Sequence, residues 1–356
     1  MIWNFLIPHI KDLQTRNITV ECACSKTGFY FEELEEKYGL VLHKISFSRS
    51  PYNISNIKCL LKLISLIKKN NFDVIHCHEP VGGAMGRVAG FITGCKVIYT
   101  AHGFHFFKGN SWLNNFIYKN VESLLARFTD ILITINDEDY NAAKTFCVKR
   151  GGGIYKISGI GCNIKKIQAL HIDRVRKRRD LGIGKDTFVV ITTAELIDRK
   201  KINIGIKAFI DAKIDNSIYL ICGDGKEEKK LKRLVEDQNI RFLGFRKDIH
   251  ELNAIADVCL FPSNQEGLSI AVIEAMAAGL KMVVSDARGV KDCIVNDKSG
   301  IICNRNKVED FSVALIFMYK QKRNSEYYTF NRKYSEKYDI DNILKEMNYI
   351  YNKHHL

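Results

Sequence analysis

The sequence predicts an α/β protein that consists of two parallel-sheet domains in succession. Its 356 residues exceed the usual length of one domain. Short apolar segments alternate with segments of helical period, an order typical of strand–helix–strand units and parallel sheets. After a polar connector over residues 164–186, the series starts again with an apolar strand at Phe188–Thr193. We therefore expect an N-terminal domain over residues 1–163 and a C-terminal domain over residues 164–333.

The elements of the first half begin with an expected helix at Met1–Leu13. The short apolar runs predict strands at residues 18–24, 40–47, 72–76, 97–100, 131–135 and 155–158. Helical spacing predicts helices at residues 29–38, 54–69, 112–128 and 140–146. A basic amphipathic helix such as 54–69 can bind a membrane, but we favour the interpretation that it covers a sheet and extends its lysines to solvent.

The composition limits the class of protein. With 46% hydrophobic residues and four prolines, the chain can form a substantial core. The eleven cysteines form no C-x-x-C pair, so we expect no disulfide framework or zinc module, and a reducing cytosol fits best. No run of eighteen apolar residues and no signal peptide are visible, which predicts a soluble cytoplasmic protein, or one that at most lies on a membrane surface.

The formal net charge of +14 favours an anionic partner, namely a nucleotide, an anionic lipid or a nucleic acid. The densest basic run is Arg174–Arg179. No aromatic residues alternate with these cations to stack on bases, so we favour a solvated helix face over a nucleic-acid site.

Two histidine stretches of the first half are candidate sites. His102 follows the strand 97–100 and precedes a glycine, a usual position for a site residue in α/β proteins; a hydrogen-bonded loop histidine is the alternative. His76-Cys77-His78 has the residue types of a metal cluster, but adjacent strand residues point to opposite faces, which disfavours a metal site.

Two helix starts of the first half also need an interpretation. Gly82, Gly83 and Gly86 open a helix at which the backbone could approach a ligand closely. Asp137–Asp139 offers an Asp-x-Asp that could hold Mg²⁺. Because these acids directly precede a helix, we favour a cap that complements the helix dipole.

The second half is organised around residues 258–285, which predict a strand, a loop, a helix and a second strand. The helix follows Gly267 and ends at Gly279. Its first N–H groups lack partners within the helix, so its start is a candidate phosphate site. Glu266 lies just before the helix and Glu274 about two turns inside it. Sugar hydroxyl groups would explain a carboxylate beside an anion site.

These two α/β halves resemble the GT-B glycosyltransferases, in which two Rossmann-like domains face a cleft. The similarity is greatest to the retaining bacterial nucleotide-sugar enzymes of family four. Its most specific part is Glu266–Glu274, which is similar to the E-x7-E signature. Supporting motifs are Cys222–Gly225, Phe242–Arg246, Phe261–Ser263 and Ala275–Gly279. Tyr99–Gly109 resembles the subgroup that makes capsular and exopolysaccharides.

The resemblance implies a role for each candidate residue. His102 would approach the sugar near the reacting carbon, Glu266 would accept hydrogen bonds from the sugar, and Lys200 would bind the diphosphate. Glu274 would bind the ribose hydroxyls. The remaining donor-binding residues would be Arg199, Gly267 and Leu268 at the diphosphate, Gly223, and Phe245, Arg246 and Ile249 in the loop that contacts the base.

The implied reaction moves a hexose or N-acetylhexosamine from a UDP-sugar to a glycan or polyprenyl-linked acceptor. The acceptor attacks from the front side, and neither a metal nor a cofactor other than the donor is expected. The implied partners are the donor, the acceptor and an anionic membrane in peripheral contact at its cytoplasmic face, with no nucleic acid. The alternatives are a UDP-binding subunit with weak catalysis and a UDP-sugar 2-epimerase of the same architecture.

The sequence also departs from the family pattern. Relatives usually begin with an apolar strand and a Gly-rich loop, so we expect the N-terminal domain to lack its first strand. The resemblance further implies that the helical tail 334–352 packs back on this domain. Ser158 and Asn163 replace a frequent proline and aspartate, and Ala194-Glu195 replaces a frequent Gly-Arg, which leaves Lys200 as the main cation.

Overall fold

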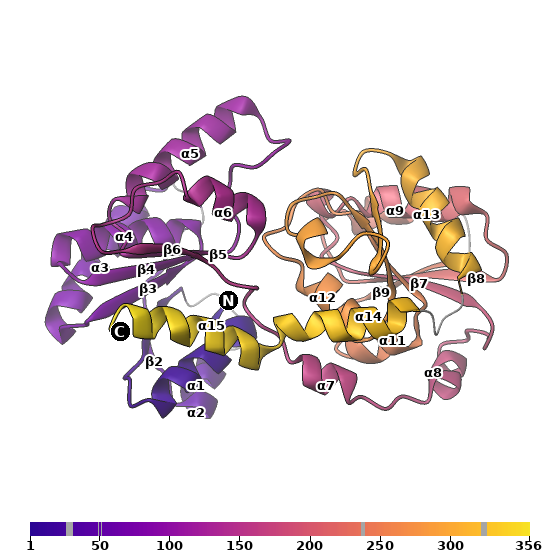
Figure 1. Ribbon diagram of the computed structural model, residues 1–356, viewed down its shortest axis with the longest axis horizontal. Coiled ribbons are helices and arrows are strands. Elements are labelled where there is room, and N and C mark those ends of the chain that lie inside the picture. The colour runs from indigo at the N-terminus through magenta and orange to yellow at the C-terminus, as the bar shows by residue number, and fades with distance from the viewer. Residues whose placement is uncertain (26–30, 49, 51, 236–238, 322–325) are drawn as a thin grey trace. The chain divides into compact units, whose positions relative to one another are not determined.

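The computed structural model describes residues 1–25, 31–48, 50, 52–235, 239–321 and 326–356 (Figure 1). The chain divides into two compact units, one of residues 1–161 and 340–356, the other of residues 162–339. The strands in the described parts of both units pair in parallel, which confirms the predicted α/β class. None of the described helices has the length and hydrophobicity that a membrane span requires.

The strands of the first unit form two parallel sheets, and no strand joins them in the described part of the chain. One sheet consists of β1 (Glu21–Cys24) and β2 (Val41–Lys44). The other has the order β3 (Val74–His78), β4 (Lys96–Ala101), β5 (Ile131–Thr134) and β6 (Gly153–Lys156). The helices are η1 (Ile2–Leu6), α1 (Ile7–Thr15), α2 (Phe31–Tyr38), α3 (Ser55–Asn70), α4 (Pro80–Thr93), α5 (Trp112–Ala126), α6 (Asp137–Ala143) and α15 (Ile340–Lys353). Residues 29–30 of the expected helix 29–38 lie outside the described residues.

Helix α3 packs as the sequence predicts. Its buried residues Cys59, Leu63 and Ile67 belong to a core cluster with Ala89 of α4, and Ile75 of β3 packs against this cluster. The interpretation of this helix as a cover is therefore confirmed.

The glycines at the start of α4 allow close packing of the helix on the sheet, whereas we expected them to allow close approach to a ligand. A Cβ atom at Gly83 would lie 2.4 Å from the ring of Tyr99, and one at Gly86 would lie 2.1 Å from Cys77 Sγ. These glycines let the helix lie directly on β3 and β4, so the interpretation of a close approach to a ligand is wrong for both. Only at Gly82 is the surrounding space open.

The tail is two helices rather than one. α14 (Glu326–Ser335) and η4 (Glu336–Tyr338) belong to the second unit, whereas α15 belongs to the first. The chain becomes extended at Asp339, which separates them. In the first unit, Ser158 donates to Glu346 of α15 through both its N–H and its Oγ, at 2.7 and 2.8 Å.

The second unit is one parallel sheet with helices on both faces. The strand order is β12 (Gly300–Cys303), β11 (Lys281–Ser285), β10 (Val258–Phe261), β7 (Phe188–Thr193), β8 (Ser217–Cys222) and β9 (Ile240–Gly244). The remaining helices are α7 (Ile164–Gln168), α8 (Arg174–Asp180), η2 (Asp198–Lys200), α9 (Ile202–Ala212), α10 (Glu228–Lys232), α11 (Ile249–Ile255), α12 (Ile270–Ala277), η3 (Lys291–Cys293) and α13 (Val308–Lys320). The charged sequence from Glu227 to Gln238 predicts a helix, of which residues 236–238 lie outside the described residues.

This strand order places a topological switch point between β7 and β10. The chain leaves β7 toward β8 and β9, and then returns to the other side of β7 with β10. In open parallel sheets, ligands bind at the carboxyl ends of the strands beside such a point.

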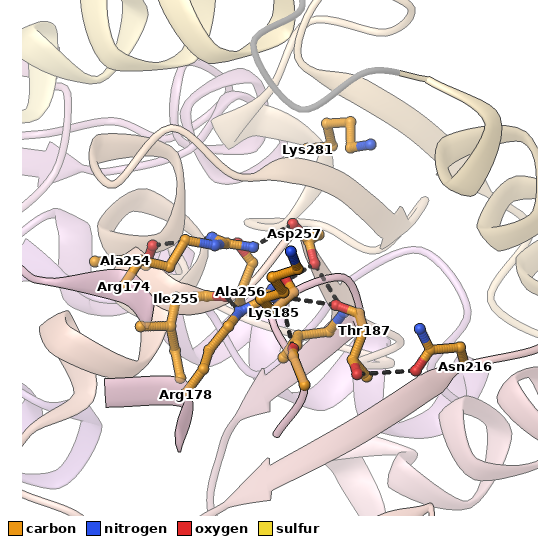
Figure 2. A network of polar contacts seen from close by, with 12 residues as sticks. Arg174, Arg178, Lys185, Thr187, Asn216, Ala254, Ile255, Ala256, Asp257 and Lys281 are labelled. Atoms are coloured by element: carbon orange, nitrogen blue, oxygen red, sulfur yellow. Dashed lines mark hydrogen bonds and ion pairs between the residues drawn. The ribbon is translucent and has the colours of Figure 1, made fainter. Parts of the chain in front are cut away.

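Arg174 and Arg178 of the basic run in α8 are part of the fold, which corrects the prediction of a solvated face for these two residues, whereas Arg176 and Arg179 are exposed as predicted (Figure 2). Arg178 is only 2% exposed and donates to the carbonyl oxygens of Ile255, Lys185 and Thr187. Its Nη2 also lies 2.8 Å from Asp257, which Arg174 contacts at 2.6 Å. These guanidinium groups therefore tie α8 to the segment that leads into β10.

Candidate active site

The second unit brings two predicted cations and one predicted carboxylate together. Arg199 and Lys200 lie in η2, after β7, and Glu266 lies in the loop after β10. Lys200 Nζ is 2.6 Å from Glu266 Oε1, and Arg199 Nη1 is 3.1 Å from Glu266 Oε2. Because β7 and β10 are neighbours, all three side chains lie at the switch point of the sheet.

Ser263 is a member of this cluster that the sequence reasoning did not assign. Its Oγ donates to Glu266 Oε1 at 2.7 Å. The Glu266 residue is 7% exposed, so two cations and a hydroxyl hold a nearly buried carboxylate in one orientation. In the sequence, the position of Ser263 two residues after the end of a strand could have indicated that it belongs to the site.

A glycine in the neighbouring loop determines the path of the Glu266 loop. Gly289 has a φ of +71°, and a Cβ there would lie 2.4 Å from the carbonyl oxygen of Gly267 and 2.6 Å from that of Glu266. The N–H of Glu266 donates to Arg288 O, and the N–H of Ser269 donates to Gly289 O. The two loops after β10 and β11 are thus in direct backbone contact.

Helix α12 begins at Ile270, later than the sequence suggested. Ser269 is the N-cap, and its Oγ accepts a hydrogen bond from Val272 N at 3.4 Å. This hydroxyl already satisfies one of the first N–H groups of the helix. Gly267 and Leu268 precede the cap, so their contact with a diphosphate stays a prediction.

Glu274 lies inside α12, largely buried in a non-polar environment. Burial raises the pKa of this carboxyl group to about 7. Its side chain has no hydrogen-bond or ion-pair partner among the described residues. A buried carboxyl group of this kind gains most from a ligand that supplies hydroxyl donors.

The carboxyl ends of β7 and β8 meet closely at another glycine. A Cβ at Gly223 would lie 1.9 Å from Ala194 O, and the Gly223 N–H donates to Gly244 O at 2.8 Å. Gly223 therefore packs three strand ends together, and its donor-binding role stays a prediction. Beside it, Thr193 Oγ1 is buried without a hydrogen-bond partner among the residues described, a feature that no sequence pattern indicated.

The loop predicted to contact the base is fixed by an ion pair. Arg246 donates to Asp248 through Nε at 2.7 Å and through Nη2 at 2.6 Å, which holds the pKa of Asp248 well below its usual range. Lys177 contacts the same carboxylate at 2.8 Å. Phe245 is 70% exposed, and Ile249 begins α11 and packs on the core. An exposed aromatic ring on a fixed loop is suited to stacking on a base.

The first unit places His102 in a cluster of histidines at the carboxyl ends of β3 and β4. His102 Nε2 lies 2.9 Å from His78 Nδ1, and His76 Nε2 lies 2.8 Å from Thr100 Oγ1. Burial lowers the pKa of His102 to about 4 and that of His76 to about 3. The imidazoles are therefore neutral near pH 7, and one of the two nitrogens that join His78 to His102 carries the shared proton.

His76 and His78 lie on one face of β3, with ring centroids 4.3 Å apart, because they are two residues apart. No group of three or more metal-ligating side chains is found in the described part of the chain. No sequence pattern indicated that His78 would meet His102, because the contact joins the ends of two different strands.

The prediction that Asp137–Asp139 complement a helix dipole is confirmed, but these acids lie in the first turn of α6 rather than before it, and none of them is the cap. The N-cap of α6 is Asn136, whose side chain accepts from Asp139 N at 2.8 Å, with acids in the first turn. Asp139 Oδ2 in turn accepts from Phe104 N at 3.0 Å. These acids stabilise the helix start and the neighbouring loop.

The arrangement in the second unit can bind an anion and a polyol side by side. Lys200 and Arg199 supply positive charge, while Glu266 and Glu274 can accept hydrogen bonds from hydroxyl groups. Among these residues, no Ser, Cys or Lys side chain is paired with a histidine that could activate it as a nucleophile.

Comparison with known proteins agrees with this chemistry. A model described as "Glycosyl transferases group 1" matches residues 173–336, and one described as "Glycosyl transferase 4-like" matches residues 2–136. The putative glycosyltransferase EpsD of Bacillus subtilis is 36% identical over 279 residues, which cover 76% of this chain and 72% of that protein.

A second relative is the UDP-Gal:alpha-D-GlcNAc-diphosphoundecaprenol alpha-1,3-galactosyltransferase of Escherichia coli. It is 30% identical over 279 residues, covering 74% of this chain and 70% of that protein. Among solved structures, Anabaena HepE in complex with UDP and glucose has a TM-score of 0.80 at 20% identity, covering 98% of this chain and 94% of that chain. The predicted fold is confirmed by this similarity.

Proposed function

Because this chain belongs to the group 1 family of glycosyltransferases, we propose that it transfers a hexose or N-acetylhexosamine from a UDP-sugar to a lipid-linked glycan acceptor in surface polysaccharide synthesis. The transfer retains the anomeric configuration and uses no bound metal. The observation that carries the proposal is the cluster of Lys200, Arg199 and Glu266 at the switch point of the second sheet.

The donor occupies this cluster through its diphosphate and its sugar. The diphosphate binds Lys200 and Arg199, which release part of their contact with Glu266. Glu266 then accepts hydrogen bonds from the sugar hydroxyls. Arg199 is well placed for this exchange because its side chain is 40% exposed. Glu274 accepts from the ribose hydroxyls, and the ring of Phe245 stacks on the base.

The chemical step needs little covalent participation by the protein. The acceptor oxygen forms a bond to the anomeric carbon while the bond from that carbon to the diphosphate oxygen breaks. The acceptor proton passes to that departing oxygen. Lys200 and Arg199 stabilise the charge that develops on the diphosphate, which is the role for which other enzymes use a metal ion.

His102 binds the transferred sugar in this proposal, and His78 positions it. A neutral His102 can donate or accept a single hydrogen bond, whereas a charged imidazolium would compete with the cations at the diphosphate. The low pKa of His102 supports this role. His78 determines through its Nδ1 contact which nitrogen of His102 carries the proton.

A panel of labelled UDP-sugars tests the proposal, each incubated with the protein and an extract of bacterial membranes. We expect one donor to give label in the lipid fraction. Label that changes sugar identity without any acceptor would instead indicate a 2-epimerase. Binding of UDP by calorimetry without transfer from any donor would indicate a nucleotide-binding subunit.

A further inference from the structure

The backbone of the loop after β10 is held from several directions. Asn264 N donates to Arg199 O at 2.8 Å, and Asn264 O accepts from Arg305 Nη1 at 3.1 Å. Gln265 O accepts from Arg199 Nη1 at 2.6 Å. The partners come from η2, after β7, and from the segment after β12. These contacts fix the path of the loop, so the residues that supply them decide where the loop places its carboxylate.

One residue binds both backbone polar groups of Glu266. The Glu266 N–H donates to Arg288 O at 3.1 Å, and Arg288 Nε donates to Glu266 O at 3.3 Å. Arg288 lies in the loop after β11 and is only 2% exposed. The removal of a guanidinium group from water is unfavourable unless acceptors receive its N–H groups. A buried arginine that contacts the backbone of a site residue is therefore a candidate for a role in the site.

The contacts of Glu266 fall into two classes with respect to a bound donor. Lys200 and Arg199 contact its carboxylate, and in the proposed function they turn toward the diphosphate. Arg288 contacts the backbone instead, and its side chain is buried, so a donor in the site would leave that contact intact. The contact with Arg288 is thus one that persists while the two cations change partners.

We propose that Arg288 is a positioning residue of the sugar site. It holds the backbone of Glu266, so that the carboxylate stays directed at the sugar hydroxyls when Lys200 and Arg199 bind the diphosphate. Hydrogen bonds weaken steeply with distance and angle, so a small displacement of this carboxylate would weaken the contacts with the sugar. Arg288 acts through Glu266 and needs no contact of its own with the donor. The inference rests on the proposed function, because it requires that Glu266 binds the transferred sugar.

The second unit offers a matched control at the opposite end of the same strand. Arg178 is also 2% exposed and donates to backbone carbonyl oxygens, among them Ile255 O at 2.8 Å. Ile255 and Asp257 precede β10, whereas Glu266 follows it. A substitution of Arg178 should therefore destabilise the unit much as a substitution of Arg288 does, without displacing the carboxylate at the other end of the strand.

Three substitutions of Arg288 separate the hydrogen bond from the charge. Methionine has a carbon at the position of Nε and removes the donor. Lysine also has a carbon there but keeps the positive charge. Glutamine loses the charge, but its amide nitrogen is as many bonds from the backbone as Nε and can donate to Glu266 O. We therefore expect Arg288→Gln to keep the function that Arg288→Met and Arg288→Lys lose.

The measured quantity is the dissociation constant of the UDP-sugar divided by that of UDP, both from calorimetry. Contributions common to the two ligands cancel, so a change in this ratio reports the sugar contacts. The ratio should rise about tenfold or more in Arg288→Met, Arg288→Lys and Glu266→Ala. It should stay within about threefold of the wild-type value in Arg288→Gln and in the control Arg178→Lys. Thermal unfolding checks that each protein is folded.

A wild-type ratio in a folded Arg288→Met or Arg288→Lys protein, beside a raised ratio in Glu266→Ala, would overturn this inference and leave the proposed function intact. A wild-type ratio in Glu266→Ala would instead contradict the proposed sugar contact itself. An equal rise in Arg178→Lys would show that lost stability, and not the position of Glu266, changes the ratio. If the methionine variant does not fold, the lysine and glutamine variants decide, and equal ratios in these two would contradict the role of Nε.

Discussion

Lys200 Nζ lies 2.6 Å from Glu266 Oε1, although the two residues are 66 positions apart in the chain. The fold joins them because β7 and β10, which precede them, are neighbours in the sheet. In the free protein the pair neutralises a cation and a carboxylate that a UDP-sugar would engage separately. In the proposed function the donor would replace this one protein contact by two contacts of its own.

Lys200→Ala should raise the dissociation constant for the UDP-sugar by about 10- to 100-fold, because a charge-assisted hydrogen bond to the diphosphate is lost. Isothermal titration calorimetry measures this change. The control is Lys201→Ala, since among the described residues Lys201 forms an ion pair only with the exposed Asp198. Equal affinities of the Lys200 variant and the wild type would remove Lys200 from the donor site.

Glu274→Gln should stabilise the free protein and weaken donor binding. Burial raises the pKa of Glu274 from 4.5 to about 7, so between these values the folded protein holds a proton that the unfolded chain has released. Stability is therefore lost as the pH rises through this range, and glutamine removes the loss. At about pH 8 we expect the free energy of unfolding to rise by on the order of 1–2 kcal/mol.

The affinity for a UDP-sugar should have a matching pH dependence. If the ribose hydroxyls donate to the ionised carboxylate, binding weakens as the pH falls through about 7. This dependence should disappear in Glu274→Gln and persist in the exposed-residue control Glu309→Gln. A UDP-sugar is preferable to UDP here, because the terminal phosphate of UDP titrates as well. A pH dependence that is the same in all three proteins would contradict the ribose role.

Gly289→Ala tests whether the backbone contact between the two loops supports the site. The new Cβ would overlap the carbonyl oxygens of Gly267 and Glu266, in addition to the strain of a positive φ. Gly182→Ala is a matched control, because its φ is +63° and no atom lies closer than 3.9 Å. We expect the control to cost about 1 kcal/mol of unfolding free energy and Gly289→Ala about 2–4 kcal/mol, with loss of donor affinity. Equal costs would show that the loop adapts freely.

The histidine cluster predicts an acid sensitivity of the first unit. Burial lowers the pKa values of His102 and His76, so between about pH 4 and 6.5 the unfolded chain binds protons that the folded unit does not. Stability should therefore fall as the pH falls through this window, by on the order of 2 kcal/mol for each histidine. Both tryptophans belong to the first unit, so their fluorescence reports its unfolding. His76→Asn should reduce the slope against pH, and an unchanged slope would contradict the burial of His76.

Much of the second unit could be predicted from the sequence because its signals are local. The run from Val258 to Ser285 encodes a strand, a helix and a second strand by apolar spacing, and Gly279 marks the helix end. Glu266 could be predicted as a site residue because it follows a strand that is itself recognisable from local apolar spacing. The resemblance to the family then indicated that Lys200 belongs to the same donor site. It did not predict that Lys200 and Glu266 are in direct contact.

The contacts that could not be predicted are non-local. Arg178 appeared to be one cation in a solvated run, yet it fills a site formed by the carbonyl of Ile255 and the carboxylate of Asp257. Gly83 and Gly86 appeared to open a helix for a ligand, but the ring of Tyr99 and the thiol of Cys77 occupy that space. In each case the deciding neighbour belongs to another strand or helix, which residue spacing alone does not specify.

The central claim is that Glu266, held by Lys200, Arg199 and Ser263, binds the transferred sugar. The most direct measurement is transfer of label from the UDP-sugar to membrane glycolipid by Glu266→Gln and Glu266→Ala, with folding checked by thermal unfolding. We predict a loss of at least about a hundredfold in kcat/KM for both folded variants. Transfer at the wild-type rate by a folded Glu266→Ala protein would contradict the account.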